Sequence, residues 1–437
     1  MYFFSTRDKE RNHPCSLRDA AFMGLAPDGG LFVPERIPEV DMDRIESLAS
    51  KSYADMACYL AGLFFGDDFP AKDLEAMVRR AYNFDCPLVK VGEGDYALEL
   101  FHGPTYAFKD FGARFMGGML GLLSRDNHSS DVLTVLTATS GDTGSAVAAG
   151  FHNVPGTRVV VLYPEGKVSD LQESQMTTLG GNIHPLKVRG CFDDCQALVK
   201  AVFNDREFRN NHYVTSANSI NVLRWIPQSF YYFMGWARWK RLTGRKYPDI
   251  VVPSGNYGNI TAGMLAHKMG MPAGRFIAAA NANDEVPLYL RTGIYEPRPS
   301  VRTVANAMDV GAPSNFERMM YLYGNDFDEL AASVSGYSYD DSRIMAAMKE
   351  IYVRDGYVSD PHSAVAYLAA KEAGADGFRL STAHSAKFLE VLHRALEPCG
   401  EDAFTVPEGL RRAMEKEKKY TFLDNSLSEL ETFIDAL

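Results

Sequence analysis

Cysteine is scarce in this chain, with only six among 437 residues. Small domains that depend on disulfides carry many closely spaced cysteines, whereas these are sparse and mostly isolated. Two of them are four residues apart and could share a helix face, but a zinc site would need further ligands nearby. The six are Cys15, Cys58, Cys86, Cys191, Cys195 and Cys399. We therefore expect reduced thiols and no bound metal.

Long apolar runs and an excess of positive charge are also missing. No stretch reaches the roughly twenty apolar residues that a membrane-spanning helix requires. The first residues, MYFFSTRDKERNHP, have no apolar core after a basic region, so they are unlike a signal peptide. The net charge is −11, and the one basic cluster, at 411–419, is interrupted by glutamates. We expect a cytoplasmic protein without nucleic-acid or membrane partners, either a monomer or a homodimer.

Short apolar runs alternate with helical patterns from about residue 95 onward. VLTVL (132–136), RVVVL (158–162) and IHPLKV (183–188) are each followed by a helical pattern, and two further runs stand at 250–252 and 276–280. Runs that are apolar throughout suit strands covered on both faces, and the alternation predicts parallel sheets. We expect an α/β protein with two sheet groups.

The chain is long enough for two or three structural units, because single cores stop growing near about 250–300 residues. The first part differs from the rest, since residues 43–83 look mainly helical. We divide the chain into an N-terminal domain, residues 1–93, and a larger region, residues 94–437. Within the larger region, residues of about 130–215 form the smaller lobe and the flanking segments form the larger lobe.

One lysine is the first candidate for chemistry. In ELFHGPTYAFKDFGARF a Gly-Pro pair breaks the chain and a helix is predicted from near Phe108, which places Lys109 in its first turn. The helix dipole disfavours a cation there and should lower the pKa of the amine, and a lysine must be neutral to attack an aldehyde. The alternative is a surface lysine paired with Asp110.

Two loops follow predicted strands and open predicted helices, an arrangement that offers backbone N–H groups to an anion. TATSGDTGSA occupies 137–146, and PSGNYGN occupies 253–259. The second loop has neither the ending of a Walker A loop nor the spacing of a dinucleotide fingerprint. A plain strand-to-helix turn explains each loop equally well. With the candidate amine, two anion loops suit a phosphorylated cofactor and an acidic substrate.

A third loop, LSTAHSAKF at 380–388, contains a hydroxyl that could face a ring nitrogen, that of Thr382. An ordinary helix N-cap is the alternative for this loop. We interpret His384 and Lys387 in the same loop as structural.

Together these residues resemble the threonine synthase family, within the fold type II pyridoxal-phosphate enzymes. The matching segments keep their order from near the start to residue 388: DGGLFVP, ELFHGPTYAFKDFG, LTATSGDTGSAVA, TSANSINVLRW, VPSGNYGN, NAMDVGAPSN, DPHSAVAY and STAHSAKF. The long segment before the lysine is similar to the longer branch of the family. Ser385 is a departure, because the family usually has proline there; this changes the rigidity of the loop but removes no proposed catalytic group.

The resemblance implies a tryptophan synthase β-like fold of two open α/β lobes with a mainly helical N-terminal domain. It implies a lyase of threonine biosynthesis that converts O-phospho-L-homoserine and water into L-threonine and phosphate. Its cofactor would be pyridoxal 5′-phosphate, bound covalently by Lys109, with Thr382 at the pyridine nitrogen. The cofactor phosphate would be held by Gly255, Asn256, Tyr257, Gly258 and Asn259. The substrate carboxylate or the cofactor O3′ would lie at Ser140, Gly141, Asp142 and Thr143.

The phosphate of the substrate needs a site of its own, and four residues are candidates for it: Arg114, Lys167, Asn221 and Arg224. Each of them is equally well explained as a surface or helix-face group. Two other functions stay open. A dehydratase or β-replacement synthase of the same fold needs no second phosphate site, and a non-catalytic homologue would only bind the cofactor or a metabolite. The intact lysine and anion loops favour the enzyme.

Overall fold

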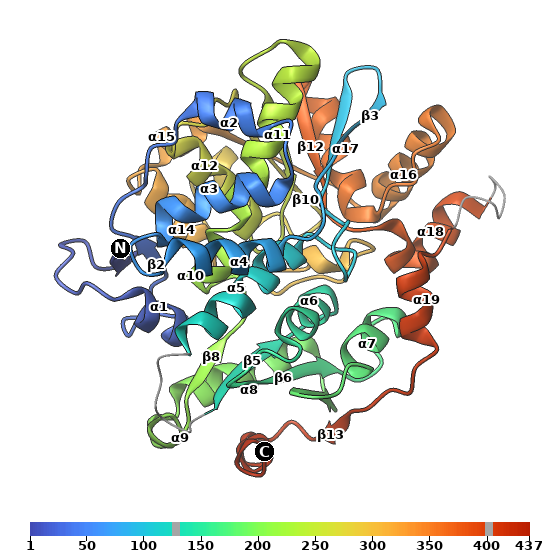
Figure 1. Ribbon diagram of the computed structural model, residues 1–437. Coiled ribbons are helices and arrows are strands. Elements are labelled where there is room, and N and C mark those ends of the chain that lie inside the picture. The colour runs from blue at the N-terminus through green and yellow to red at the C-terminus, as the bar shows by residue number, and fades with distance from the viewer. Residues whose placement is uncertain (125–131, 398–404) are drawn as a thin grey trace.

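The computed structural model describes residues 1–124, 132–397 and 405–437 (Figure 1). Cys399 lies outside the described residues, and the other five cysteines are free thiols. Within these ranges no group of His, Cys, Asp or Glu side chains could hold a metal ion. In the same part of the chain, no helix has both the length and the apolar character needed to cross a membrane.

The N-terminal segment is a two-stranded ribbon followed by helices that share a core with the rest of the chain. Its elements are β1 (Phe3–Ser5), α1 (Leu17–Met23), β2 (Phe32–Pro34), α2 (Met42–Leu48), α3 (Tyr53–Phe65) and α4 (Ala71–Ala81). A capping box at Ser52 fixes the start of α3. Leu60 and Phe64 of α3 are buried in the same apolar cluster as Phe111 of α5 (Lys109–Leu123). The segment therefore braces the helix that begins at Lys109.

A six-stranded sheet forms the larger lobe. Its order is β11-β10-β9-β12-β4-β3, and every pair is parallel except β3 with β4. The strands are β3 (Leu88–Gly92), β4 (Asp95–Glu99), β9 (Asp249–Pro253), β10 (Phe276–Ala280), β11 (Val334–Ser338) and β12 (Gly377–Ser381). β3 precedes the boundary proposed at residue 93 and pairs with β4 beyond it.

Helices cover both faces of this sheet, as the unbroken apolar runs predict. Ile250 and Val252 pack in one cluster with α11 and α12, and Val251 packs in another with α16 and α17. The helices of this lobe are α10 (Val222–Trp225), α11 (Gln228–Thr243), α12 (Gly258–Lys268), α13 (Glu285–Thr292), η1 (Asn306–Met308), α14 (Phe316–Leu322), α15 (Phe327–Ser333), α16 (Asp341–Asp355), α17 (Pro361–Ala373), η2 (Ser385–Phe388) and α18 (Leu389–Leu396).

The smaller lobe is built on a five-stranded parallel sheet of order β13-β7-β6-β5-β8. Val159 packs toward α6 and Val160 toward α8, so this sheet is also covered on both faces. Its elements are β5 (Leu133–Ala138), α6 (Asp142–Phe151), β6 (Thr157–Pro164), α7 (Asp170–Thr177), β7 (Ile183–Val188), α8 (Phe192–Asn204), α9 (Arg206–Asn211) and β8 (Val214–Ser216). The prediction of two α/β lobes with parallel sheets is confirmed.

The C-terminal segment returns from the larger lobe to the smaller one (Figure 1). It consists of α19 (Glu408–Met414), β13 (Thr421–Leu423) and α20 (Leu427–Asp435). β13 pairs with β7 at the edge of the five-stranded sheet, and Leu430 of α20 is buried against that sheet. The smaller lobe therefore contains residues far beyond the stretch of about 130–215 that the sequence predicts.

Candidate active site

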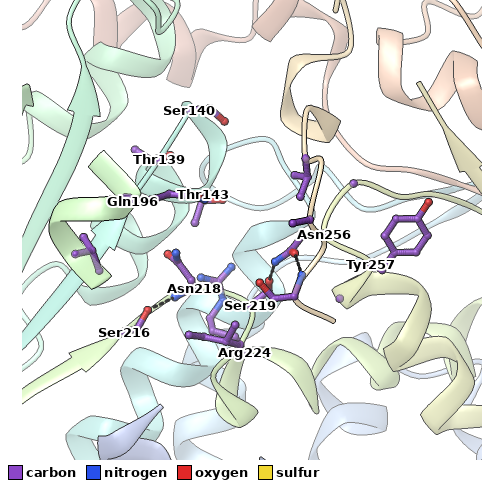
Figure 2. A pocket seen from close by; sticks show the side chains of 18 of the residues that line it. Thr139, Ser140, Thr143, Gln196, Ser216, Asn218, Ser219, Arg224, Asn256 and Tyr257 are labelled. Atoms are coloured by element: carbon purple, nitrogen blue, oxygen red, sulfur yellow. Dashed lines mark hydrogen bonds between the residues drawn. The ribbon is translucent and has the colours of Figure 1, made fainter. Parts of the chain in front are cut away.

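A cavity of about 860 Å³ is lined by residues of both lobes and of the N-terminal segment. The segments that follow the carboxyl ends of β5, β8, β9 and β12 all contribute to it, which is where open parallel sheets place their ligands. Figure 2 shows Thr139, Ser140 and Thr143 on one side of this cavity and Asn256 on the other, with Arg224 below them in this view. The three predicted loops and the candidate lysine thus meet in one place.

Lys109 is the first residue of α5 and lines the cavity. Burial lowers the pKa of its amine to about 8, the nearby Asp142 opposes this shift, and Arg224 and Lys387 add to it. The direction matches the prediction, although burial and two cations cause it rather than the helix dipole alone. Asp110 instead accepts two hydrogen bonds from Thr105, one from the backbone N and one from Oγ1, each at 2.8 Å. The lysine is therefore an enclosed amine that deprotonates near neutral pH.

The loop from Gly255 to Asn259 presents its main-chain donors to the cavity. Among the described residues, none of its five backbone N–H groups has an acceptor, and the loop leads into the amino end of α12. The Asn256 side chain fixes the loop, because Nδ2 donates to Ser219 Oγ at 2.6 Å and Oδ1 accepts from Ser314 N at 2.6 Å (Figure 2). Such a set of free N–H groups at a helix start suits a phosphate.

Two residues of this loop show why its sequence is specific. Tyr257 adopts a left-handed backbone conformation, with φ 58°, and its ring points away from the other labelled side chains in Figure 2. A Cβ added at Gly255 would lie 2.5 Å from Met308 Cα. Only glycine allows the loop to pass this close to η1.

The loop between β5 and α6 has a different construction. Thr139 Oγ1 accepts from the N–H groups of Gly141 and Gly144 at 2.9 and 2.8 Å, and α6 begins without a side-chain cap. Neither Asp142 nor Thr143 acts as the cap that the alternative interpretation required. Thr143 lines the cavity together with Ser140. Hydroxyl and uncapped N–H donors are thus available to an anion here.

Asp142 is not free to repel such an anion, because its carboxylate is already paired. Its Oδ1 lies 2.7 Å from Lys387 Nζ and accepts from Gln172 Nε2 at 2.8 Å. Burial would raise the pKa of Asp142, but Lys387 and Lys109 lower it well below its usual range. Asp142 is therefore a buried carboxylate with a fixed counter-ion.

Arg224 is the predicted phosphate ligand that reaches the cavity. Its Nη1 donates to Ala217 O, while its Nε is buried and has no partner among the described residues. Burial lowers the pKa of this guanidinium to about 10, and Asp110 opposes the shift. A buried cation in the lining of the cavity is suited to hold an anion.

Thr382 follows β12 directly and lines the cavity. Its backbone is held on both sides, because its N–H donates to Ser363 Oγ at 3.1 Å and its carbonyl accepts from Phe108 N at 2.8 Å. The hydroxyl is thereby presented from a rigid position beside Lys109.

The structure does not bring the other three predicted phosphate ligands into the cavity lining. Arg114 donates from Nε to Ala81 O at 2.7 Å, which ties α5 to the end of α4. Lys167 is exposed on the turn after β6. Asn221 caps α10, and its Nδ2 donates to the carbonyl of Ala21 at 2.9 Å. The donors of Arg114 and Asn221 are used within the fold, and substrate binding by these three residues stays a prediction.

Three polar residues at the site were missed as individual candidates. Asn218 and Ser219 line the cavity after β8, and the only signal for them was their place in the TSANSINVLRW segment. Lys387 was interpreted as structural, and nothing in its local sequence shows that it reaches Asp142.

Comparisons with known proteins agree with this site. Residues 89–379 match the family described as "Pyridoxal-phosphate dependent enzyme". Residues 2–82 match "Threonine synthase N terminus", and residues 363–434 match "Threonine synthase, C-terminal". The chain belongs to the threonine synthase family.

Individual threonine synthases are similar over nearly their whole length. That of Serratia marcescens is 40% identical over 98% of both chains, and that of Escherichia coli is 43% identical over 89% of this chain and 90% of its own. The solved structure of the Brucella melitensis threonine synthase, with pyridoxal phosphate bound, has a TM-score of 0.91 at 34% identity and covers 100% of this chain and 99% of its own. The structure of the Escherichia coli threonine synthase has a TM-score of 0.90 at 38% identity and covers 100% of both chains. The chain is therefore a pyridoxal-phosphate-dependent lyase of the fold type II class.

The cavity of this threonine synthase family member fits its cofactor. Five unpartnered N–H groups suit the cofactor phosphate, an enclosed amine suits its aldehyde, and the Thr382 hydroxyl suits its ring nitrogen.

The low pKa of Lys109 predicts how pH governs the capture of the cofactor. Only the neutral amine attacks an aldehyde, and burial brings the pKa of this amine down to about 8. Below that pH, we expect the rate at which cofactor-free protein develops visible absorbance with pyridoxal phosphate to rise about tenfold per pH unit. Above about pH 8 it should level off, and a rate that climbs on to about pH 10 would show an ordinary lysine.

Proposed function

We propose that this chain converts O-phospho-L-homoserine and water into L-threonine and phosphate, with Lys109 as the residue that binds pyridoxal phosphate covalently. One observation carries the choice of substrate: the cavity has an anion site beyond the loop that suits the cofactor phosphate. Arg224 provides a buried cation in the lining of the cavity there, and Ser140 and Thr143 provide hydroxyl groups. A substrate with both a carboxylate and a phosphate needs this second set of donors.

The cofactor, when bound, supplies an electron sink for the carbanion chemistry. The side chains of the protein supply orientation and proton transfer. Lys109, with a pKa of about 8, is suited to take protons from the α- and β-carbons and to return protons at the γ- and α-carbons, because it can change protonation state near neutral pH. Arg224 would neutralise the phosphate that leaves from the γ-carbon. The enclosed walls of the cavity would hold water away until the addition step.

Thr382 has a proposed role in tuning this chemistry. A hydroxyl at the ring nitrogen stabilises less positive charge there than a carboxylate would. The cofactor is then a weaker electron sink, which disfavours transamination. We place the whole reaction in the cytoplasm, in keeping with sparse cysteines that carry free thiols.

The test compares substrates on the full-length protein with pyridoxal phosphate. O-phospho-L-homoserine should give inorganic phosphate and L-threonine in equal amounts, measured by a phosphate assay and amino-acid analysis. L-serine and L-threonine serve as the comparison substrates. Conversion of these to oxo acids without phosphate release from O-phospho-L-homoserine would move the function to a dehydratase. Absorbance of the bound cofactor without turnover of any substrate would favour the non-catalytic binder.

A further inference from the structure

A buried ion pair joins the two lobes beside the candidate amine. Lys387 belongs to η2 of the larger lobe and Asp142 begins α6 of the smaller lobe; the Lys387 side chain is 0% exposed and that of Asp142 4%. Lys387 Nζ lies 2.7 Å from Asp142 Oδ1 and donates to Thr105 O at 2.7 Å. Thr105 also holds Asp110, the neighbour of Lys109. The ion pair and Asp110, the neighbour of Lys109, therefore share Thr105 as a contact.

The position of Asp142 would work against the chemistry of the site if the carboxylate stood alone. It lies in the loop whose donors suit an anion, and an uncompensated carboxylate there would repel that anion. It also acts on Lys109, where its charge raises the pKa of the amine. An isolated Asp142 would keep Lys109 protonated and unreactive.

The titratable groups around Lys109 come from five elements. Arg224 on α10 and Lys387 on η2 lower the pKa of its amine, and Asp142 on α6 raises it. Asp110 on α5 itself is directed to Thr105, and its pKa is raised by burial to about 6. His362 of α17 also lines the cavity; its Nε2 accepts from Ala307 N, and its Nδ1 donates to Asp360 Oδ1 at 2.9 Å. Among these groups, Lys387 is the one in direct contact with the carboxylate that opposes deprotonation.

We propose that Lys387 is a positioning residue that neutralises Asp142, and so keeps the Lys109 amine reactive and the α6 loop open to an anion. This rests on the proposed role of Lys109, but not on the identity of the substrate. Lys387 touches no reacting atom; it acts through Asp142. The ion pair thus sets the charge around Lys109 and also links the two lobes.

The competing explanation is that the pair only fastens the two lobes together. The two explanations predict different patterns of shift in the pKa of Lys109. If the pair only holds the two lobes together, removing either partner loosens the same contact and shifts the pKa of Lys109 in the same direction. If Lys387 neutralises Asp142, removing the cation raises the pKa of Lys109, whereas removing the carboxylate lowers it. Opposite shifts from the two ends of one ion pair are therefore the diagnostic result.

The experiment measures Lys109 directly in the full-length, cofactor-free protein. Competitive labelling with acetic anhydride at a series of pH values, read on the Lys109 peptide by mass spectrometry, gives the neutral fraction of the amine. The variants are Lys387→Gln, which keeps a donor for Thr105 O, Asp142→Asn, which keeps the shape of the carboxylate, and the double variant. Lys418→Gln is the matched control, because Lys418 pairs with Asp170 and Glu173.

Near neutral pH we expect Lys387→Gln to lower the labelling of Lys109 about tenfold, the result of a pKa shift of about one unit. Asp142→Asn should increase labelling by up to about tenfold, the double variant should return close to the wild type, and the control should not change it. Shifts of the same sign in both single variants, or no shift in either, would overturn the proposal. If Lys387→Gln fails to fold, the increase in Asp142→Asn and its cancellation in the double variant still decide the question. Labelling needs neither cofactor nor substrate, so its outcome is separate from that of the substrate test.

Discussion

Replacing Lys109 with alanine should remove both the covalent capture of pyridoxal phosphate and the formation of threonine. The variant loses the amine that reacts with the aldehyde and the base that moves the α-proton. General acid–base catalysis alone is worth about 10²–10⁴-fold, so we expect the rate of phosphate release to fall by at least about 10³-fold. Lys387 is not available as a substitute, because its side chain is fully buried in its pair with Asp142. The measurements are the visible absorbance spectrum with added pyridoxal phosphate and the phosphate assay.

Two controls separate this loss from misfolding. Lys51→Ala removes an exposed lysine of the N-terminal segment and should keep both the absorbance band and the activity. Thermal unfolding of Lys109→Ala should stay close to that of the wild type, because the substitution removes an enclosed cation at a helix start while the Lys387–Asp142 pair stays in place. A visible band of normal intensity in Lys109→Ala would show that another amine holds the cofactor.

The sequence predicted the scaffold of this site well, for physical reasons. Strands covered on both faces are apolar throughout, so β5, β6, β7, β9 and β10 were recognisable as runs. β13 was not, because an edge strand of three residues with two exposed side chains carries little apolar signal. The loops that line the cavity followed from the strands, since parallel strands bring their carboxyl ends to one side.

The individual ligands were harder to predict, because spacing does not say where a helical side chain points or what it already contacts. Arg114 and Asn221 are in the right segments, but the carbonyls of Ala81 and Ala21 occupy their donors. Lys387 is the opposite case, a residue whose partner lies in the other lobe. Local motifs identify donors, and only the tertiary structure shows which donors are free.

Replacing Gly255 with alanine should weaken binding of the cofactor with little change elsewhere. The new Cβ would lie 2.5 Å from Met308 Cα, a backbone atom that cannot rotate away. The loop must shift, and the five unpartnered N–H groups proposed to hold the cofactor phosphate would move with it. Overpacking of this kind costs about 1–3 kcal/mol, so we expect the dissociation constant for pyridoxal phosphate to rise by roughly 5- to 150-fold. Titration of the cofactor-free protein, followed by absorbance, measures it.

Two other glycines serve as comparisons for Gly255→Ala. A Cβ at Gly258 would meet the Asn315 side chain at 3.2 Å, and because a side-chain amide can move, Gly258→Ala should weaken binding less than Gly255→Ala. Gly62 of α3 has no atom within 4 Å of its added Cβ, so Gly62→Ala should leave binding unchanged. In that helix interior it should raise the free energy of unfolding by up to about 1 kcal/mol. Equal affinities for Gly255→Ala and the wild type would mean that the cofactor phosphate is held elsewhere, since a loop pushed from η1 cannot keep the same set of donors.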